Sequence, residues 1–334
     1  MRMKLGKKEL AALISAGDGA SLGARAASLA APFPERPITI VVGFPPGGGD
    51  MLIREIATHM GEDLGQEILL DYRPGAAGNV GAASVARAER DGYTIFLAGR
   101  SNIFHRLMYD DVDYDFSFDL TPVGLVAKMP FVVVAGKNTP LSSMNDIIMP
   151  ASPRHPPGGY TCAYAEIGTT SHLLGGFLQQ SVGIRLMSAP YLGVVEALAD
   201  VIGGRTDLLI FPLPMALPLI RRGNIKALVI MAHQRVAALP DVPAIDEFGL
   251  AGADAEGWYA LMAPARTPRA IVATLNRALN TALAQPVLKE RLECLSYIPA
   301  HPPENTPDTL RALIAQETEK WTAVLMDRNI NTLH

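Results

Sequence analysis

The chain has 334 residues, which is enough for two α/β lobes and too many for a single small core. Hydrophobic residues make up 49% and charged residues 19%, so the chain can bury a core and is not a disordered linker protein. The net charge of −4 comes without any basic run, which argues against nucleic-acid binding and favours a small-molecule ligand.

Residues 1–31 carry some features of an export signal. Basic side chains stand near the start, and the small residues 28–31 resemble a cleavage site. The apolar stretch between them is short and is interrupted at residues 17–19. We interpret residues 1–31 as a weak or eroded export signal, with a disordered or helical leader as the alternative. No window holds the eighteen apolar residues of a membrane span, so the chain is not expected to cross a bilayer.

The first predicted strand, residues 38–42, ends in a turn stiffened by prolines and followed by three glycines, Phe44-Pro45-Pro46-Gly47-Gly48-Gly49. A helical pattern begins directly after these glycines. Glycines at a strand end let backbone N–H groups converge, and the following helix adds its positive dipole end. The turn therefore suits a carboxylate or phosphate, although an ordinary strand-to-helix loop would show the same pattern.

A second unit of the same design follows. Residues 67–72 read as a strand, residues 73–79 as a glycine-containing turn and residues 80–88 as a helix of small residues. A third strand, residues 93–99, leads into the polar residues Arg100 and Ser101. Such turns at the start of one domain can direct two sets of amides at one ligand.

The rest of the chain continues the alternation of strands and helices. Two short apolar strands lie within residues 121–135, and one of them is a candidate to cross to another lobe. Further strands are predicted at residues 161–165, 184–189, 207–211, 225–232 and 257–263. Helices are predicted at residues 173–180, 194–202, from Pro214, and at 268–284, 286–294 and 307–326. This alternation predicts parallel sheets with the ligand beyond the carboxyl ends of the strands.

Several classes of site are absent from the sequence. Cys162 and Cys294 lie far apart without metal-like spacing, so we expect two buried free thiols in different lobes and no zinc site. The chain has no dinucleotide-binding fingerprint with a ribose acid, no G-x-S-x-G elbow, no HExxH pair and no P-loop lysine. No catalytic residue, metal or cofactor is therefore predicted, and an α/β enzyme acting on an anionic substrate stays the less favoured alternative.

Read together, these segments resemble the extracytoplasmic solute receptors of tripartite tricarboxylate transporters, also called Bug receptors. The resemblance covers residues 33–330 and rests on short motifs in a fixed order. These are the turns at residues 44–49 and 73–81, Asp91-Gly92-Tyr93-Thr94, residues 168–173, Tyr191-Leu192-Gly193, Gly203-Gly204 and residues 239–243.

The resemblance implies an α/β protein with the two-lobed periplasmic-binding-protein fold of type II. Two mostly parallel sheets flanked by helices would enclose a cleft, with residues 32–131 and 256–334 in the first lobe and residues 132–255 in the second. Hinge strands are expected near residues 131–135 and 256–261. The implied protein is a periplasmic monomer, not an enzyme, that closes over a small carboxylate-bearing or amino-acid-like solute and docks on a membrane permease. Open alternatives are a receptor that presents its ligand to a sensor, and a cytoplasmic placement.

The family's binding roles fall on backbone and hydroxyl groups of both lobes. In the first lobe they fall on Pro46, Gly47, Gly48, Gly49, Gly75, Ala76, Ala77 and Gly78. In the second lobe they fall on Gly168, Thr169, Thr170 and Ser171. The hydroxyl residues at positions 169–171 would also suit a helix N-cap, and both roles are compatible. His172 is expected to pack structurally at the helix start.

This chain departs from the family pattern at three places. The first glycine turn is one residue shorter ahead of Asp50, the expected helix N-cap, and Tyr164 and Glu166 replace a small serine and a glycine. Glu166 in the cleft would repel a di- or tricarboxylate and attract an amine. Arg100 would balance Glu166, bind a ligand carboxylate or face solvent. We therefore predict an amphoteric or aromatic carboxylate, stacked by Tyr164 or Phe44.

Overall fold

The computed structural model describes residues 33–46, 50–104, 108–109, 112–149, 158–191, 193–250 and 256–327, the last four by their backbone alone. The predicted leader, residues 1–31, lies outside these ranges. Residues Arg36–His334 form one compact unit that contains both sheets of the protein. No helix in the described part of the chain has the length and apolar character that a membrane span requires.

The first lobe is built on a six-stranded sheet. Its strands in spatial order are β11 (Ile298–Pro299), β4 (Leu120–Met129), β10 (Gly257–Pro264), β3 (Thr94–Gly99), β1 (Ile38–Val42) and β2 (Ile68–Tyr72). β1 pairs in parallel with β2 and β3, whereas β10 pairs antiparallel with β3 and β4, and β11 antiparallel with β4. The carboxyl ends of β1, β2 and β3 therefore meet at one edge.

The second lobe is built on a five-stranded sheet. Its strands in spatial order are β7 (Leu186–Pro190), β6 (Tyr160–Tyr164), β8 (Leu208–Pro212), β5 (Phe131–Gly136) and β9 (Ile225–Met231). β6 pairs in parallel with β7 and β8, and β5 pairs antiparallel with β8 and β9.

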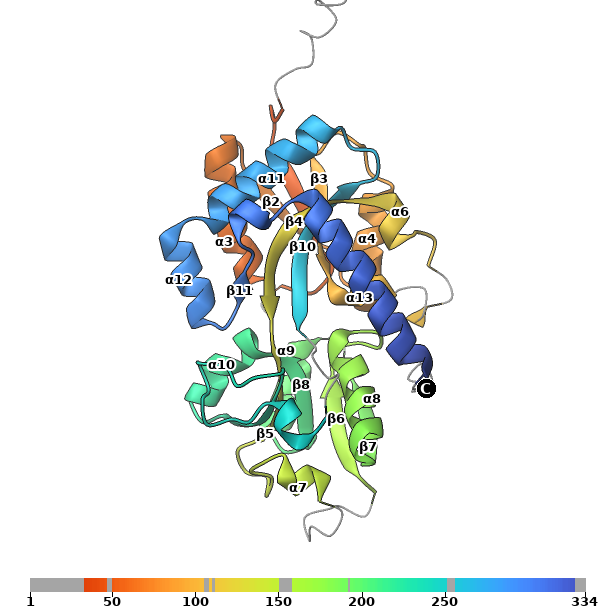
Figure 1. The fold of residues 1–334 in the computed structure, drawn as a ribbon, viewed down its shortest axis with the longest axis vertical. Coiled ribbons are helices and arrows are strands. Elements are labelled where there is room, and N and C mark those ends of the chain that lie inside the picture. The colour runs from red at the N-terminus through yellow and green to blue at the C-terminus, as the bar shows by residue number, and fades with distance from the viewer. Residues whose placement is uncertain are drawn as a thin grey trace, which may run out of the picture. The chain divides into compact units, whose positions relative to one another are not determined.

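The two-lobed α/β fold is as predicted, but the sheets are mixed rather than mostly parallel. The reason is the path of the chain between the sheets. β4 continues through Pro130 directly into β5, so β5 enters the second sheet from the end nearest the first lobe, where β8 ends, and runs antiparallel to β8 and β9 (Figure 1). The return from β9 likewise brings β10 into the first sheet antiparallel to β3 and β4. Local sequence patterns carry no information about such long-range strand directions.

Helices cover both faces of the six-stranded sheet. They are α3 (Met51–Leu64), α4 (Asn79–Ala86), α6 (Phe116–Asp119), α11 (Arg269–Leu283), α12 (Pro286–Cys294) and α13 (Pro307–Asp327). Val41 and Phe96 share a buried cluster with Val85 of α4 and with Leu310 and Trp321 of α13. α3 packs against α11, and Figure 1 shows α3 and α4 on opposite sides of the sheet.

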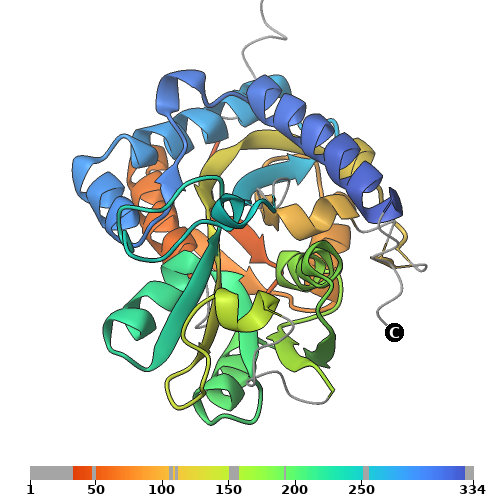
Figure 2. The same ribbon diagram turned by 60° about the horizontal axis from the view of Figure 1, so that its bottom comes forward.

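The five-stranded sheet is covered by α8 (Thr170–Val182) on one face and by α9 (Val194–Ile202) and α10 (Leu213–Arg221) on the other, with the short α7 (Asn145–Ile148) nearby (Figure 2). Alternate residues of β5 explain this arrangement, because successive side chains of a strand point to opposite faces. Val133 belongs to the same buried cluster as Phe177 of α8, whereas Val134 belongs to a second cluster with Ala197 of α9. Full burial of each such side chain contributes roughly 1.5–3 kcal/mol.

The two cysteines lie in different lobes and form no disulfide. Cys162 in β6 is buried, and burial raises the pKa of its thiol to about 12. Cys294 is exposed, so the prediction of a buried thiol is wrong at that position. It is the last residue of α12 and lies two positions after the buried Leu292, which puts it on the opposite side of the helix from the core.

Candidate functional site

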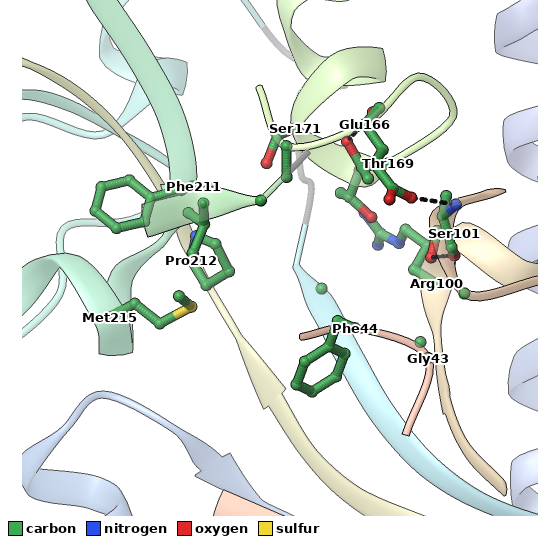
Figure 3. Close-up of a pocket in the computed structure, with 18 of the residues that line it drawn as sticks. Gly43, Phe44, Arg100, Ser101, Glu166, Thr169, Ser171, Phe211, Pro212 and Met215 are labelled. Atoms are coloured by element: carbon green, nitrogen blue, oxygen red, sulfur yellow. Dashed lines mark hydrogen bonds between the residues drawn. The ribbon is translucent and has the colours of Figure 1, made fainter. Parts of the chain in front are cut away.

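A cavity of about 480 Å³ is lined by both lobes, a size typical of small-molecule sites (Figure 3). From the first lobe it is lined by the turn after β1, by the start of α4 and by the segment after β3. From the second lobe it is lined by the segment after β6, by the starts of α8 and α9 and by the end of β8. The polar and acidic residues among its lining are Arg100, Ser101, Asn102, Glu166, Thr169, Thr170, Ser171 and Glu196.

The turn after β1 lies against the turn after β2. A Cβ atom on Gly43 would come within 2.6 Å of the Gly78 Cα atom, so only glycine permits this approach. Ala76 and Ala77 have φ angles of 49° and 52°, in the left-handed region that costs an ordinary residue about 1–2 kcal/mol. This conformation turns the Ala77 amide toward the second lobe, where it donates to Glu166.

Buried polar side chains hold these first-lobe turns in place. Asn102 accepts a hydrogen bond from the Gly99 N–H at 2.9 Å and donates to the Asn79 Oδ1 atom at 3.4 Å. Tyr114 also donates to Asn79, at 2.6 Å. Ser101 donates to the Ala77 carbonyl at 3.2 Å. These bonds connect the end of β3 with the start of α4 and fix the peptide units that face the cavity.

Arg100 lines the cavity but is bound within its own lobe. Its Nη2 atom lies 2.7 Å from Glu317 Oε2, and its guanidinium lies 5.1 Å from the Trp321 ring centre. The Arg100 and Glu317 side chains are only 3% and 15% exposed. Of the three roles expected for Arg100, the partnership with Glu166 and the solvent-facing position are therefore wrong, because α13, distant in sequence, supplies the carboxylate that neutralises the buried guanidinium.

The start of α8 forms the polar part of the second-lobe wall. Thr169 is the N-cap, and its hydroxyl accepts from the His172 N–H at 3.4 Å and donates to the Glu166 carbonyl at 2.7 Å. His172 is buried as predicted and accepts a hydrogen bond from the Gly168 N–H at 3.2 Å; its ring packs against that of Tyr164 at a tilt of 43°, with 4.7 Å between the ring centres. Burial lowers the pKa of His172 to about 4, so the imidazole is neutral at pH 7.

Glu166 connects the two lobes. Its Oε2 atom accepts a hydrogen bond from the Ala77 N–H at 2.6 Å, between residues 89 positions apart (Figure 3). Burial raises the pKa of Glu166, and the hydrogen bond from Ala77 offsets part of that rise. The carboxylate therefore sits at the first-lobe amides that were predicted to hold a ligand.

The structure brings together many of the residues predicted from the sequence. Those that line the cavity are Phe44, Pro46, Ala77, Gly78, Arg100, Ser101, Glu166, Thr169, Thr170 and Ser171. Gly47, Gly48 and Gly49 lie outside the described residues. Lining does not test binding, so their roles stay predictions.

Four predicted residues do not line the cavity. Three of them, Gly75, Ala76 and Gly168, have φ angles of 128°, 49° and 80°. They shape turns whose neighbouring residues line the cavity. Tyr164 is buried against His172 and is not among the lining residues, so its position gives no support to the predicted stacking on a ligand. The parity of β6 explains this, since its last residue packs on α8 instead of pointing to the cavity.

Asp50 has a different role from the one expected. It precedes α3, but its side chain makes no capping hydrogen bond. Instead its Oδ2 atom accepts from Arg54 at 2.8 Å and from Tyr72 at 2.6 Å, and it is not among the residues that line the cavity. The negative charge of Asp50 is thus balanced by Arg54.

Sequence reasoning missed part of the lining. Glu196 stands in the first turn of α9, and Phe211, Pro212 and Met215 follow from the end of β8 into α10. Figure 3 places Pro212 and Met215 across the cavity from Ser101 and Glu166. A usable signal existed for Glu196, because Gly193 precedes a helix in the same strand-turn-helix pattern. The end of β8 is apolar throughout and carries no sequence signal of this kind. Within the described residues, no group of three or more potential metal-ligating side chains is present.

Comparisons with known proteins agree on one family. The model of the tripartite tricarboxylate transporter family receptor, TctC, matches residues 52–330. The protein BugT of Bordetella pertussis is 34% identical over 309 residues, which cover 90% of this chain and 93% of BugT. The solved structure of the periplasmic binding protein BugD has a TM-score of 0.83 at 30% identity, covering 89% of this chain and 99% of that one.

A further solved structure contains a ligand. MatC from Rhodopseudomonas palustris, solved with bound malate, has a TM-score of 0.81 at 31% identity, over 88% of this chain and all of MatC (100%). The family match covers most of the sequence, and the similarity in structure extends over both lobes. The chain therefore belongs to the tripartite tricarboxylate transporter receptor family.

Proposed function

We propose that this protein is an extracytoplasmic receptor that binds one small carboxylate-bearing metabolite in the cavity and delivers it to a tripartite tricarboxylate-type permease. The observation that carries the proposal is the cavity itself: strand and helix ends of both lobes meet there, in a chain of this receptor family. The malate bound to MatC shows that a relative takes a carboxylate. BugD, a periplasmic binding protein, supports placement outside the cytoplasm.

The proposal includes the division into lobes at residues 32–131 with 256–334 and residues 132–255. The strand membership of the two sheets supports it, as do the crossings at Pro130 and between β9 and β10. Closure of the lobes would let amides and hydroxyls replace the water around the ligand. We propose that the receptor acts as a monomer that docks transiently on the permease.

The ligand carboxylate is proposed to bind at the start of α8. A helix of 13 residues directs its first amides and its positive dipole end toward the cavity, where Thr170 and Ser171 also contribute hydroxyls. His172 does not line the cavity, and its Nδ1 atom is occupied by the Gly168 N–H. That geometry does not suit a general base and supports binding without chemistry.

A thermal-shift screen over carboxylates, amino acids and aromatic acids tests this function. A ligand present at a hundred times its dissociation constant stabilises the folded state by about 2.7 kcal/mol. We expect at least one carboxylate to raise the melting temperature of the wild type, and Ser171→Trp, which fills the cavity at the start of α8, to abolish the shift. The absence of any shift, or an equal shift in a folded Ser171→Trp variant, would contradict the proposal. Fractionation of the native host tests the placement.

A further inference from the structure

Most of the charged side chains in the described lining of the cavity are acidic. Within the described lining, the ionisable acids and bases other than tyrosine are Arg100, Glu166 and Glu196. Arg100 is already neutralised by Glu317 at 2.7 Å. The two glutamates, both from the second lobe, therefore leave the described lining with excess negative charge.

The first glutamate occupies a donor in the first lobe. Glu166 Oε2 lies 2.6 Å from the Ala77 nitrogen, at a turn where left-handed backbone turns the amide toward the second lobe. A ligand carboxylate at the same amide would have to displace Glu166 and would then lie beside its charge. The Ala77 N–H is thus already hydrogen-bonded within the protein.

The second glutamate covers the start of α9. A Cβ atom on Gly193 would lie 2.9 Å from Glu196 Oε2, so the carboxylate folds back over the N-terminus of its own helix. Negative charge is stabilised there by the helix dipole. An anion arriving at α9 would therefore meet a carboxylate instead of an open helix end.

One helix start remains open to an anion. Thr169 caps the His172 N–H at the start of α8, and the amides of Thr170 and Ser171 make no hydrogen bond found among the described residues. The far side of the cavity is apolar: the ring centres of Phe44 and Tyr259 lie 5.9 Å apart with the rings tilted by 38°, and Pro212 and Met215 lie opposite Glu166 (Figure 3). The start of α8 is thus a place for a negative group, and the apolar wall suits the rest of the ligand.

We propose that the cavity selects a ligand with a single carboxylate and an apolar body, and that Glu166 and Glu196 reject di- and tricarboxylates. The inference rests on the proposed function and narrows its ligand class. It sets this chain apart from MatC, whose bound malate carries two carboxylates. Removing the two negative charges should remove the electrostatic repulsion of a second carboxylate on the ligand.

Isothermal titration calorimetry with phenylacetate, phenylalanine and malate tests the inference. The wild type is expected to bind phenylacetate or phenylalanine at least about tenfold tighter than malate, and the double variant Glu166→Gln with Glu196→Gln to gain at least about tenfold in malate affinity. Glutamine keeps the shape and the acceptor oxygen for the Ala77 N–H, and each single variant should show part of the gain. Glu290→Gln on the exposed face of α12 makes the same change in net charge as either single variant, away from the cavity, and should leave malate binding unchanged.

The outcomes separate this inference from the proposed function. If malate binds the wild type as tightly as both monocarboxylates, or if the double variant leaves the preference unchanged while folded, the inference is wrong and the receptor function stands. The same holds if neither monocarboxylate binds but another carboxylate of the thermal-shift screen does. If no carboxylate in that screen binds, both the inference and the proposed receptor function are wrong.

Discussion

The two walls of the cavity are made differently. The first-lobe wall consists of backbone turns held by glycine contacts and by the buried Asn79 and Asn102, and its only cation is paired with Glu317 among the described residues. The second-lobe wall consists of helix starts and two carboxylates, Glu166 and Glu196. The comparison indicates that the first lobe fixes the shape of the site, whereas side chains of the second lobe set its charge.

The largest expected effect concerns the charged residue of the first-lobe wall. If Arg100 is structural, Arg100→Gln leaves the Glu317 carboxylate buried without its guanidinium partner and lowers the free energy of unfolding by about 3–5 kcal/mol. Adding Glu317→Gln should restore much of this loss. Chemical denaturation of the two single variants and the double variant measures the coupling. A loss below about 1 kcal/mol for Arg100→Gln would show that the pair does not hold the wall.

A smaller loss is expected at the contact between the first-lobe turns. In Gly43→Ala the new methyl group would meet the Gly78 backbone at 2.6 Å, and we expect a loss of about 2–3 kcal/mol of unfolding free energy from the forced shift. Gly175→Ala in α8 is the matched control, since nothing lies within 4 Å of its Cβ position. Alanine favours a helix, so the control should be unchanged or more stable by up to about 1 kcal/mol. Equal effects of the two variants would argue against a shape-fixing turn.

The start of α8 makes the second-lobe wall sensitive to acid. Burial lowers the pKa of His172 to about 4 from the ordinary 6.5, so folding favours the neutral imidazole. The contribution of the buried neutral imidazole to the free energy of unfolding is fully present above pH 6.5. It is lost as the pH falls toward 4, and the loss is at most about 3 kcal/mol. Unfolding free energies measured across this window should fall more steeply for the wild type than for His172→Gln. Parallel curves would mean that His172 is not buried in its neutral form.

The smallest effect concerns the carboxylate that bridges the lobes. Burial raises the pKa of Glu166, so ionisation in the folded state is penalised as the pH rises through the raised value. Glu166→Gln keeps the acceptor and avoids this cost. We expect the variant to gain less than about 1 kcal/mol relative to the wild type near pH 7, and to lose that advantage below the ordinary pKa of a glutamate. A variant that is less stable than the wild type near pH 7 would show that the charge strengthens the bridge.

Much of the fold followed from local patterns. The helices Val194–Ile202 and Pro286–Cys294 agree with their predicted ranges because glycine or proline bounds each apolar repeat. The two-residue strand β11 was missed, since so short a segment carries no periodicity. The antiparallel course of β5 and β10 depends on chain paths between lobes, which no local pattern encodes.

The candidate site was predictable where it consists of turns after strands. Ala77, Gly78 and the start of α8 were found in this way. The partner of Arg100 was not, because Glu317 approaches from a helix more than two hundred positions along the chain. Tyr164 was misplaced because the side-chain parity at a strand end depends on packing against α8, here through His172.

The most direct test of the account is whether both walls hold one ligand. Hydrogen exchange can be measured with and without the carboxylate that gives the largest thermal shift. The account predicts that the ligand protects the amides of Gly43 and Phe44, which line the cavity in the first lobe, together with those of Thr170 and Ser171 in the second. Protection confined to one lobe, or to surfaces away from these turns, would contradict it.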